Sequence, residues 1–320
     1  MNSKKTLIVS HAPFWHDGSG IPERSYHTII AALPAALVGL AFYGAPALGV
    51  ISLAMSSAIL WELLFNYVSK RPITIGNGNA ALIGLLLAML LPASVPWWVV
   101  LIGTFLAIVI GIQIYGGIGA NPFNPVALAV AILAVSYSTH LDFDAGLVNF
   151  SLDFPSVTHP LTDLKAFGPS AIEHLNYVDL LMGRQVGGLG ATCGLALVAG
   201  GIYLILRGII RWEISVAFVA GVFITAALFN MADPTRYASP VFHLLAGYTL
   251  FGAFFLATES SSSPVNVIPM LLFGALGGIM TVLIRNIGAY EDGVIFAILL
   301  INLINPLVDK IRPKAIGKVA

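Results

Sequence analysis

Thiol groups are nearly absent from this chain, because only one of its 320 residues is a cysteine. One thiol forms no intrachain disulfide and falls short of the several thiolates that an iron–sulfur cluster usually takes. Of seven histidines, only His243 lies near an apolar segment. A b-type haem held by two opposed histidines within a membrane has no ligand pair here. Any cluster or haem that works with this chain must therefore be bound elsewhere.

Charge is equally scarce, since only 9% of the residues are charged and the formal net charge is zero. Hydrophobic residues make up 58% of the chain, and the mean hydropathy is +0.91. This composition excludes a soluble domain and predicts a polytopic membrane protein. The first apolar run follows about two dozen polar residues, so no cleavable signal segment is expected. We expect a lipid bilayer around the chain and no nucleic-acid partner.

Nucleotide-binding motifs are missing as well. The chain has no GxxxxGK[ST] motif, and its glycine cluster at Gly116-Gly117-Ile118-Gly119 lacks the strand–helix–strand context of a dinucleotide site. We therefore expect neither NADH nor ATP to bind this chain itself. If the chain moves electrons, a flavin is the carrier that remains.

About ten apolar stretches are candidates to cross roughly 30 Å of hydrocarbon. They lie at Ile29–Phe42, Leu48–Val68, Ala80–Leu91, Trp97–Tyr115, Val126–Ser138, Thr192–Leu206, Ile214–Phe229, Val241–Thr258, Val267–Ile284 and Gly293–Val308. Some are short for a full crossing, which is typical where glycine- and proline-rich segments such as Gly116–Pro125 enter the membrane as broken helices. The prediction is an all-α membrane protein with about ten transmembrane helices.

The basic residues fix an expected orientation. Placing the N-terminus in the cytoplasm puts eleven of the fifteen basic residues on the inner side, namely Lys4, Lys5, Arg24, Lys70, Arg71, Arg207, Arg211, Lys310, Arg312, Lys314 and Lys318. Lys165, Arg184, Arg236 and Arg285 fall outside. This bias follows the positive-inside rule. It predicts a membrane protein with both termini in the cytoplasm and Thr192 on the external side.

The two halves of the chain are similar in pattern. Gly84–Trp98 parallels Gly252–Val267, and after each comes a glycine-rich helix, a polar turn and another apolar helix. Five spans per half would insert the second half upside down, which is the inverted-repeat plan of the urea-transporter-like architecture. We expect one integral membrane domain over residues 1–320. Its parts are a cytoplasmic tail (1–25), a first repeat (26–138), an external loop (139–184), a second repeat (185–309) and a basic cytoplasmic tail (310–320).

The external loop is mildly acidic. It carries six carboxylates against two cations, at Asp142, Asp144, Asp153, Asp163, Glu173 and Asp179. We expect it to cap the Thr192 end of the molecule, and its single carboxylates also fit a solvated loop without chemistry.

Thr192 follows a short glycine-rich run, Gly187-Gly188-Leu189-Gly190-Ala191, and opens an apolar segment without charge until Arg207. The free N–H groups and positive dipole end of a helix favour an anion at such a position. The residues alone also fit a membrane-helix threonine that caps its own helix or bonds a carbonyl one turn back.

Leu189-Gly190-Ala191-Thr192 resembles the Ser/Thr-Gly-Ala-Thr signature of the RnfD/NqrB family of membrane redox subunits, matching three of four positions. The resemblance runs through most of the chain, in the further blocks Ser10–Pro13, Ala81–Ala88, Leu91–Trp98, Gly116–Pro125, Gly252–Thr258 and Ala289–Ala297. It implies FMN joined to Thr192 by a phosphoester, with Gly190 and Ala191 in the attachment motif. Leu189 and Cys193 depart from the family pattern, and Glu259–Pro264 stands where the family has Asp-Pro-Val-Thr-Ser-Pro.

The resemblance implies a subunit of an Rnf-type complex that couples ferredoxin:NAD⁺ redox chemistry to Na⁺ or H⁺ movement. It implies a bacterial inner membrane as the location, which puts the external side, with Thr192, in the periplasm. Its partners would be the other Rnf subunits, including a periplasmic-side FMN subunit and iron–sulfur subunits, and a flavin transferase for maturation. A second, non-covalent flavin such as riboflavin is a further expectation. Two alternatives stay open: an NqrB-type subunit of a Na⁺-pumping quinone reductase, and a small-solute channel or permease of the urea-transporter type, which would be colourless.

Charged residues within or beside apolar spans are costly and often mark function. Glu62 and Glu259 are the candidates for ion coupling, and Asp233, Arg285 and the pair Glu291/Asp292 lie near span ends. A helix-end ion pair or an interfacial position is the structural alternative for each. Two Asn-x-x-Asn-Pro elements, 121–125 and 302–306, place amides beside prolines. These amides fit either freed backbone carbonyls or a cofactor or hydrated cation.

Overall fold

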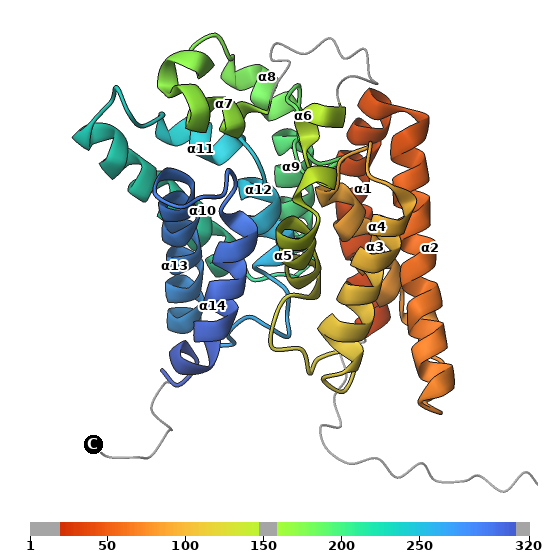
Figure 1. Ribbon diagram of the computed structural model, residues 1–320. Helices are drawn as coiled ribbons and strands as arrows, with labels where there is room; N and C mark the ends of the chain where they lie inside the picture. Colours follow the sequence, from red (N-terminus) through yellow and green to blue (C-terminus); the bar gives the residue numbers. More distant parts are fainter. Residues whose placement is uncertain (1–19, 147–158, 312–320) are drawn as a thin grey trace, which may run out of the picture.

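The structure, a computed structural model, describes residues 20–146 and 159–311, and every regular element within those ranges is helical (Figure 1). Four helices are long and apolar enough to cross a membrane: Ile21–Tyr43 (α1), Ala45–Val68 (α2), Trp212–Ala232 (α10) and Val267–Asn286 (α13). Shorter apolar helices stand between them. The structure thus confirms an all-helical chain with several membrane-crossing candidates.

The first half continues through η1 (Ile75–Asn77), α3 (Asn79–Leu90), α4 (Trp97–Phe105), η2 (Leu106–Gln113) and α5 (Pro125–Ser136). Proline stands in the first turn of α1, α2 and α5, where its missing N–H costs nothing. Gly44 joins α1 to α2 with a φ of +65°, a conformation that glycine adopts without strain. The 24 residues of α2 follow at once on α1.

The second half contains α9 (Gly194–Leu206), α10, α11 (Pro240–Leu245), α12 (Thr249–Phe251), η6 (Gly252–Leu256), α13 and α14 (Val294–Val308). The expectation of one continuous helix over Val241–Thr258 is wrong, because the chain is extended at Ala246 and Gly247 has a φ of +66°. The buried Arg285 donates to the carbonyls of His243 (2.7 Å) and Ala246 (3.2 Å). It thereby satisfies carbonyl groups that the break removes from the helix.

Short helices form a cap at one end of the molecule, around the labels α6, α7 and α8 in Figure 1. They are η3 (Ser138–His140), α6 (Phe143–Gly146), α7 (Pro160–Phe167), η5 (Pro169–Ile172) and α8 (Tyr177–Met182). Leu161, Ile172 and Leu180 pack with Phe242 of α11 in a small apolar cluster. The external loop is therefore folded onto the helices where it is described; Asp153 lies outside the described residues.

Glycines allow α10 and α13 to pack closely. A Cβ at Gly221 of α10 would lie 2.5 Å from the carbonyl oxygen of Ala275, and one at Gly274 of α13 would meet the carbonyl oxygen of Ile214. Small residues of this kind let helices approach within a membrane, where hydrophobic burial drives packing weakly. Any larger residue at these two positions would push the helices apart.

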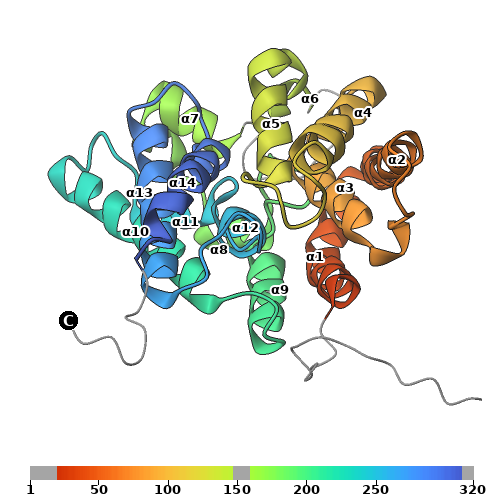
Figure 2. The same ribbon diagram turned by 90° about the horizontal axis from the view of Figure 1, so that it is seen from below.

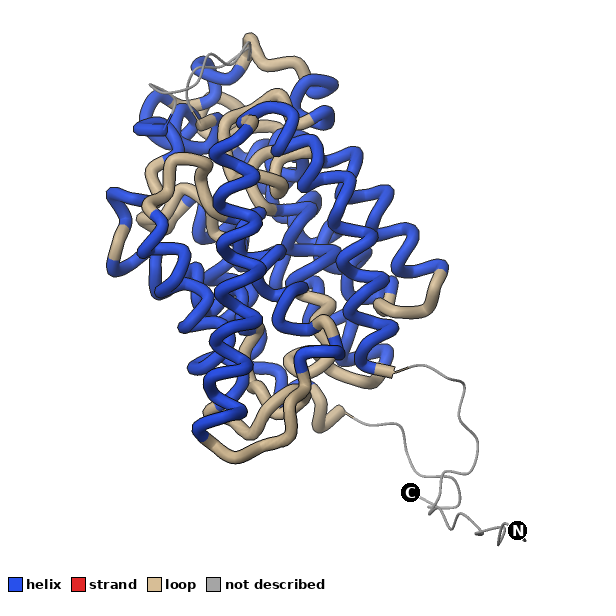
Figure 3. The backbone as a smooth tube through the Cα atoms, turned by 90° about the vertical axis from the view of Figure 1, so that its right-hand side faces the viewer, coloured by secondary structure: helices blue, strands red, loops and turns tan. Residues whose placement is uncertain are grey.

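The halves meet beside α12, which lies near the middle of the molecule when it is seen from below, with α5 above it and α14 to its left (Figure 2). Asn302 of α14 accepts a hydrogen bond from the backbone N–H of Asn124, which precedes α5 (3.0 Å). The long helices run between the cap and the opposite end (Figure 3). Because α1 begins and α14 ends at that opposite end, we call it the inner end and the cap end the outer end (Figure 1).

Candidate functional site

Thr192 lies in the link between α8 and α9, at the outer end. The link is held by the end of α3, because Leu189 donates its N–H to the carbonyl of Leu91 and Gly190 donates to Met89, both at 3.1 Å. Helix α9 begins at Gly194 and not at Thr192 as expected, because the backbone of Cys193 is not helical (ψ 88°). Thr192 therefore precedes the helix and its N-cap.

The glycines of the link are required by its neighbours. A Cβ at Gly188 would lie 2.6 Å from the Met89 carbonyl oxygen, and a Cβ at Gly190 would lie 2.8 Å from Cε of Met89. On the facing helix α1, a Cβ at Gly39 would overlap the Leu189 carbonyl. The glycines of the expected attachment motif are thus also needed for the close packing that positions Thr192.

The Thr192 side chain is largely enclosed, with 7% of its surface exposed. Its methyl group packs on Gly187, where a Cβ would come within 2.6 Å of it. The Gly187 carbonyl accepts a hydrogen bond from the Tyr43 hydroxyl (3.4 Å). Ala191 is buried, with 1% of its surface exposed. The backbone around Thr192 is therefore fixed from several sides.

Gln185 is the positioning residue that the sequence analysis missed. Its Nε2 donates to the carbonyls of Thr192 (3.2 Å), Leu180 (3.2 Å) and Leu245 (2.9 Å), which joins the link to α8 and α11. The side chain is 1% exposed, and its Oε1 has no hydrogen-bond partner among the described residues. A glutamine just before the glycine-rich run was the only signal in the sequence.

The start of α9 suits an anion. Its first backbone bond runs from the N–H of Leu197 to the Cys193 carbonyl, so the N–H groups of Gly194, Leu195 and Ala196 have no helical acceptor. Cys193 makes no side-chain capping bond. Thr192 is not the N-cap, which removes that structural alternative. A phosphate ester on the hydroxyl just ahead of these N–H groups fits the donors that the chain presents.

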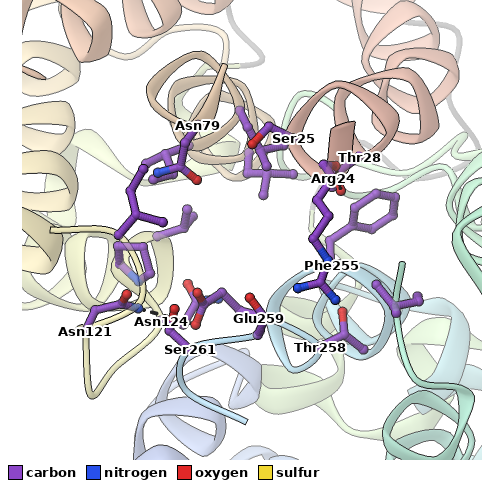
Figure 4. A pocket seen from close by; sticks show the side chains of 18 of the residues that line it. Arg24, Ser25, Thr28, Asn79, Asn121, Asn124, Phe255, Thr258, Glu259 and Ser261 are labelled. Atoms are coloured by element: carbon purple, nitrogen blue, oxygen red, sulfur yellow. Dashed lines mark hydrogen bonds between the residues drawn. The ribbon is translucent and has the colours of Figure 1, made fainter. Parts of the chain in front are cut away.

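A pocket, separate from the surroundings of Thr192, opens at the inner end. Helices α1 and α3 face η6 there, together with the turns before α5 and after η6 (Figure 4). Polar groups line it, including Arg24, Ser25, Asn79, Asn121 and Glu259. Asn121 donates to Glu259 at 3.3 Å, and the backbone N–H of Ser262 donates to the same carboxylate at 2.9 Å. Glu259 is therefore held in place but bonded to no cation among the described residues.

The asparagines of the two Asn-x-x-Asn-Pro elements satisfy backbone groups, as the structural alternative expected. Asn124 caps α5 at Ala127 (2.9 Å) and donates to the Leu256 carbonyl (2.9 Å). Asn302 and Asn305 both donate to the Ser262 carbonyl. Of these bonds, the one from Asn124 to Leu256 joins the two halves at the inner end, and Asn121 and Asn124 also line the pocket.

Glu62 lies elsewhere, buried on α2 with 2% of its surface exposed. Its Oε1 accepts a bond from the Thr74 hydroxyl (2.6 Å), whose oxygen accepts from Asn66 (3.0 Å). Its Oε2 has no partner among the described residues. Glu62 does not line the Glu259 pocket, so the structure does not bring the two coupling candidates together.

The remaining charged candidates have structural partners. Arg285 pairs with Asp292 at 2.9 Å, and Asp292 also accepts from the backbone N–H of Tyr248. Glu291 accepts from the Thr162 hydroxyl (2.7 Å), whereas Asp233 accepts from Thr235 in an exposed turn. Helix-end bonding accounts for these residues.

Comparison with known proteins places the chain in a family. The model of the NQR2, RnfD, RnfE family matches residues 8–317. The D-subunit of the proton-translocating ferredoxin:NAD(+) oxidoreductase complex of Clostridium ljungdahlii is 34% identical over 313 residues, covering 96% of this chain and 95% of the relative. The D-subunits of the ion-translocating oxidoreductase complexes of Escherichia fergusonii and Cronobacter sakazakii are 32% and 33% identical, each over 97% of this chain and 98% of the relative. The chain belongs to the NQR2, RnfD, RnfE family.

Proposed function

We propose that this chain is the membrane subunit of an Rnf-type ion-translocating ferredoxin:NAD⁺ oxidoreductase and that it carries FMN on Thr192. The observation that carries the proposal is the enclosed threonine beside three N–H groups of α9 that have no acceptor within the helix. The names of the relatives support a redox-driven ion translocase. The names of these relatives favour an Rnf-type subunit over an NqrB-type one, and the family itself argues against a solute channel.

The residues of the chain have distinct roles in this proposal. Thr192 supplies the ester oxygen, and the N–H groups at the start of α9 stabilise the phosphate charge. Gln185 and the α3 carbonyls hold the link in one conformation, so the flavin has a fixed position. A flavin, when bound, accepts and releases electrons singly or in pairs, and fixed placement keeps the distance to an electron partner short.

We extend the proposal to topology. Ten membrane segments would form two inverted repeats, with α11, α12 and η6 together making one broken crossing. The inner end would face the cytoplasm of a bacterial inner membrane and the cap the periplasm. The cap would then meet a periplasmic-side FMN subunit, and iron–sulfur subunits would supply or take electrons elsewhere in the complex.

The inner pocket is the candidate for a second, non-covalent flavin. Amides, hydroxyls and Phe255 line it, which suits a ring with several hydrogen-bonding edges. Its cavity of about 160 Å³ is below the roughly 300–1,000 Å³ of usual ligand pockets. A flavin would therefore enter only if flexible side chains such as Arg24 move aside.

Flavin attachment is tested with the whole complex, co-expressed with a flavin transferase. We expect the subunit to fluoresce on a denaturing gel and to gain the mass of an FMN ester. Thr192→Val should lose both signals, because the ester needs a hydroxyl, whereas Thr192→Ser should keep them. Thr235→Val, in an exposed turn, is the matched control. An assembled wild-type subunit without the added mass would refute the covalent flavin.

A further inference from the structure

A cavity of about 520 Å³ lies at the outer end, between α5, the cap and the turn that precedes α14. This volume falls within the roughly 300–1,000 Å³ typical of ligand pockets. Its walls combine aromatic and acidic side chains, among them Phe143, Tyr248, Phe296, Asp144 and Asp292. None of the residues proposed to attach or position the flavin at Thr192 lines this cavity.

His159, at the N-cap of α7, brings to this cavity a buried ring nitrogen without a hydrogen-bond partner among the described residues. Only 4% of the residue is exposed, and its ring stacks on Phe143 with centroids 5.5 Å apart and planes at 22°. Its Nδ1 makes no hydrogen bond within the described part of the chain. A buried polar atom without a partner is costly and calls for a ligand or water.

Three acidic side chains of the cavity wall already accept hydrogen bonds. Asp292 accepts from Arg285 and from the backbone of Tyr248, Glu291 accepts from Thr162, and Asp144 accepts from the backbone N–H of His159 (2.7 Å). Burial lowers the pKa of the His159 imidazole, outweighing the carboxylates of Asp292, Glu291 and Asp144, while Arg285 lowers it further. His159 is therefore neutral at pH 7 and presents one donor and one acceptor nitrogen.

Thr192 and His159 both lie close to the same face of Gly187. A Cβ built on Gly187 would lie 2.6 Å from Cγ2 of Thr192 and 3.8 Å from Nε2 of His159. The attachment point and the unpaired imidazole are thus neighbours, although they come from different segments. A group tethered to Thr192 has the cavity within its immediate surroundings.

We propose that this outer cavity houses the isoalloxazine ring of the flavin on Thr192, and that Nδ1 of His159 hydrogen-bonds to that ring. The inference rests on the proposed function, because it needs the covalent flavin. Phe143 and Phe296 supply aromatic walls for a planar ring, and the ring offers both N–H and carbonyl groups to the imidazole. The surrounding carboxylates would disfavour extra negative charge on the ring, so its reduction would be accompanied by proton uptake.

The test uses purified complex with His159→Leu, His159→Gln and the cap control His174→Gln, whose side chain is exposed. In-gel fluorescence measures attachment, while the absorption band and midpoint potential of the native flavin report its surroundings. We expect attachment to persist in all three variants. The band and potential should shift in His159→Leu, return partly towards wild type in His159→Gln and stay unchanged in His174→Gln.

A second variant keeps the test independent of His159. Ala134→Phe, on α5, should fill the cavity, displace the ring and make native flavin fluorescence several-fold easier to quench with iodide. Unchanged spectrum, potential and quenching in both His159→Leu and Ala134→Phe would place the ring elsewhere and overturn the inference. A wild-type subunit without covalent flavin would instead refute the proposed function first, and the inference with it.

Discussion

At the scale of single residues, Gln185 shows how one side chain can hold a functional segment. We expect Gln185→Leu to reduce FMN on Thr192 several-fold, because three buried carbonyls would lose their shared donor. Each buried group left unsatisfied costs about 1–3 kcal/mol, which is enough to loosen the link. In-gel fluorescence per assembled complex measures the effect. Gln113→Leu, a buried glutamine of η2, is the control, and equal fluorescence in both variants would remove the positioning role.

Glu62 is a buried carboxylate whose role in ion coupling can be tested by a single substitution. We expect the complex with Glu62→Gln to assemble with normal flavin content and to transfer electrons, but to build less than half of the wild-type ion gradient per electron. The carboxylate is buried, and one of its oxygens has no partner among the described residues, so its charge is not needed to hold a cation of the protein. Ion uptake into proteoliposomes measures the gradient. A full gradient would make Glu62 structural, and Glu259→Gln run alongside tests the inner pocket.

At the scale of elements, the break between α11 and α12 depends on Arg285. Arg285→Met should destabilise the subunit by about 3–5 kcal/mol, the usual result of removing one partner from a buried ion pair. It would leave Asp292 uncompensated and the carbonyls of His243 and Ala246 without their donor. Thermal unfolding in detergent measures the loss. The double variant Arg285→Met/Asp292→Asn should recover part of it; no recovery would show that the carbonyl bonds dominate.

The cap should respond to pH through His159. Burial lowers its pKa, so the unfolded chain binds more protons, and the stability that the neutral ring contributes is lost as pH falls below about 6.5. Asp144 acts in the opposite sense, because burial raises its pKa above the ordinary value of 3.8, so it opposes the His159 effect at the acid end of the range. Between pH 7 and 5 we expect faster amide exchange in α7. His159→Gln should abolish this dependence, and an unchanged slope in that variant would assign it to another group.

The apolar stretches of the sequence predicted most helices correctly to within a few residues, because a buried or lipid-facing helix needs a continuous apolar run. The break at Ala246–Gly247 was not predictable, since the group that satisfies its carbonyls, Arg285, lies some forty residues away. The motif at Thr192 was visible as sequence. Its surroundings were not: Gln185, His159 and the end of α3 meet Thr192 only through tertiary packing.

At the scale of the whole molecule, contacts between distant segments bring the expected inner cations to one end. Arg24 donates to the Ile209 carbonyl, Arg207 lies 3.8 Å from Glu23, and Arg71 donates to the Gly116 carbonyl. Lys165 lies at the other end, where it donates to the turn before α14. The fold thus gathers the expected cytoplasmic cations at one end of the molecule, in agreement with the positive-inside rule.

Cysteine labelling tests the orientation that follows from this charge separation. The single native cysteine, Cys193, is buried, so introduced cysteines give a clean signal. Ser170→Cys on the cap and Ser69→Cys after α2 are both exposed positions. A membrane-impermeant maleimide should label Ser170→Cys in spheroplasts and reach Ser69→Cys only after permeabilisation, because the positive-inside bias puts Lys70 and Arg71 in the cytoplasm. The reverse pattern would turn the molecule over, place Thr192 on the cytoplasmic side and remove the periplasmic electron partner from the proposal.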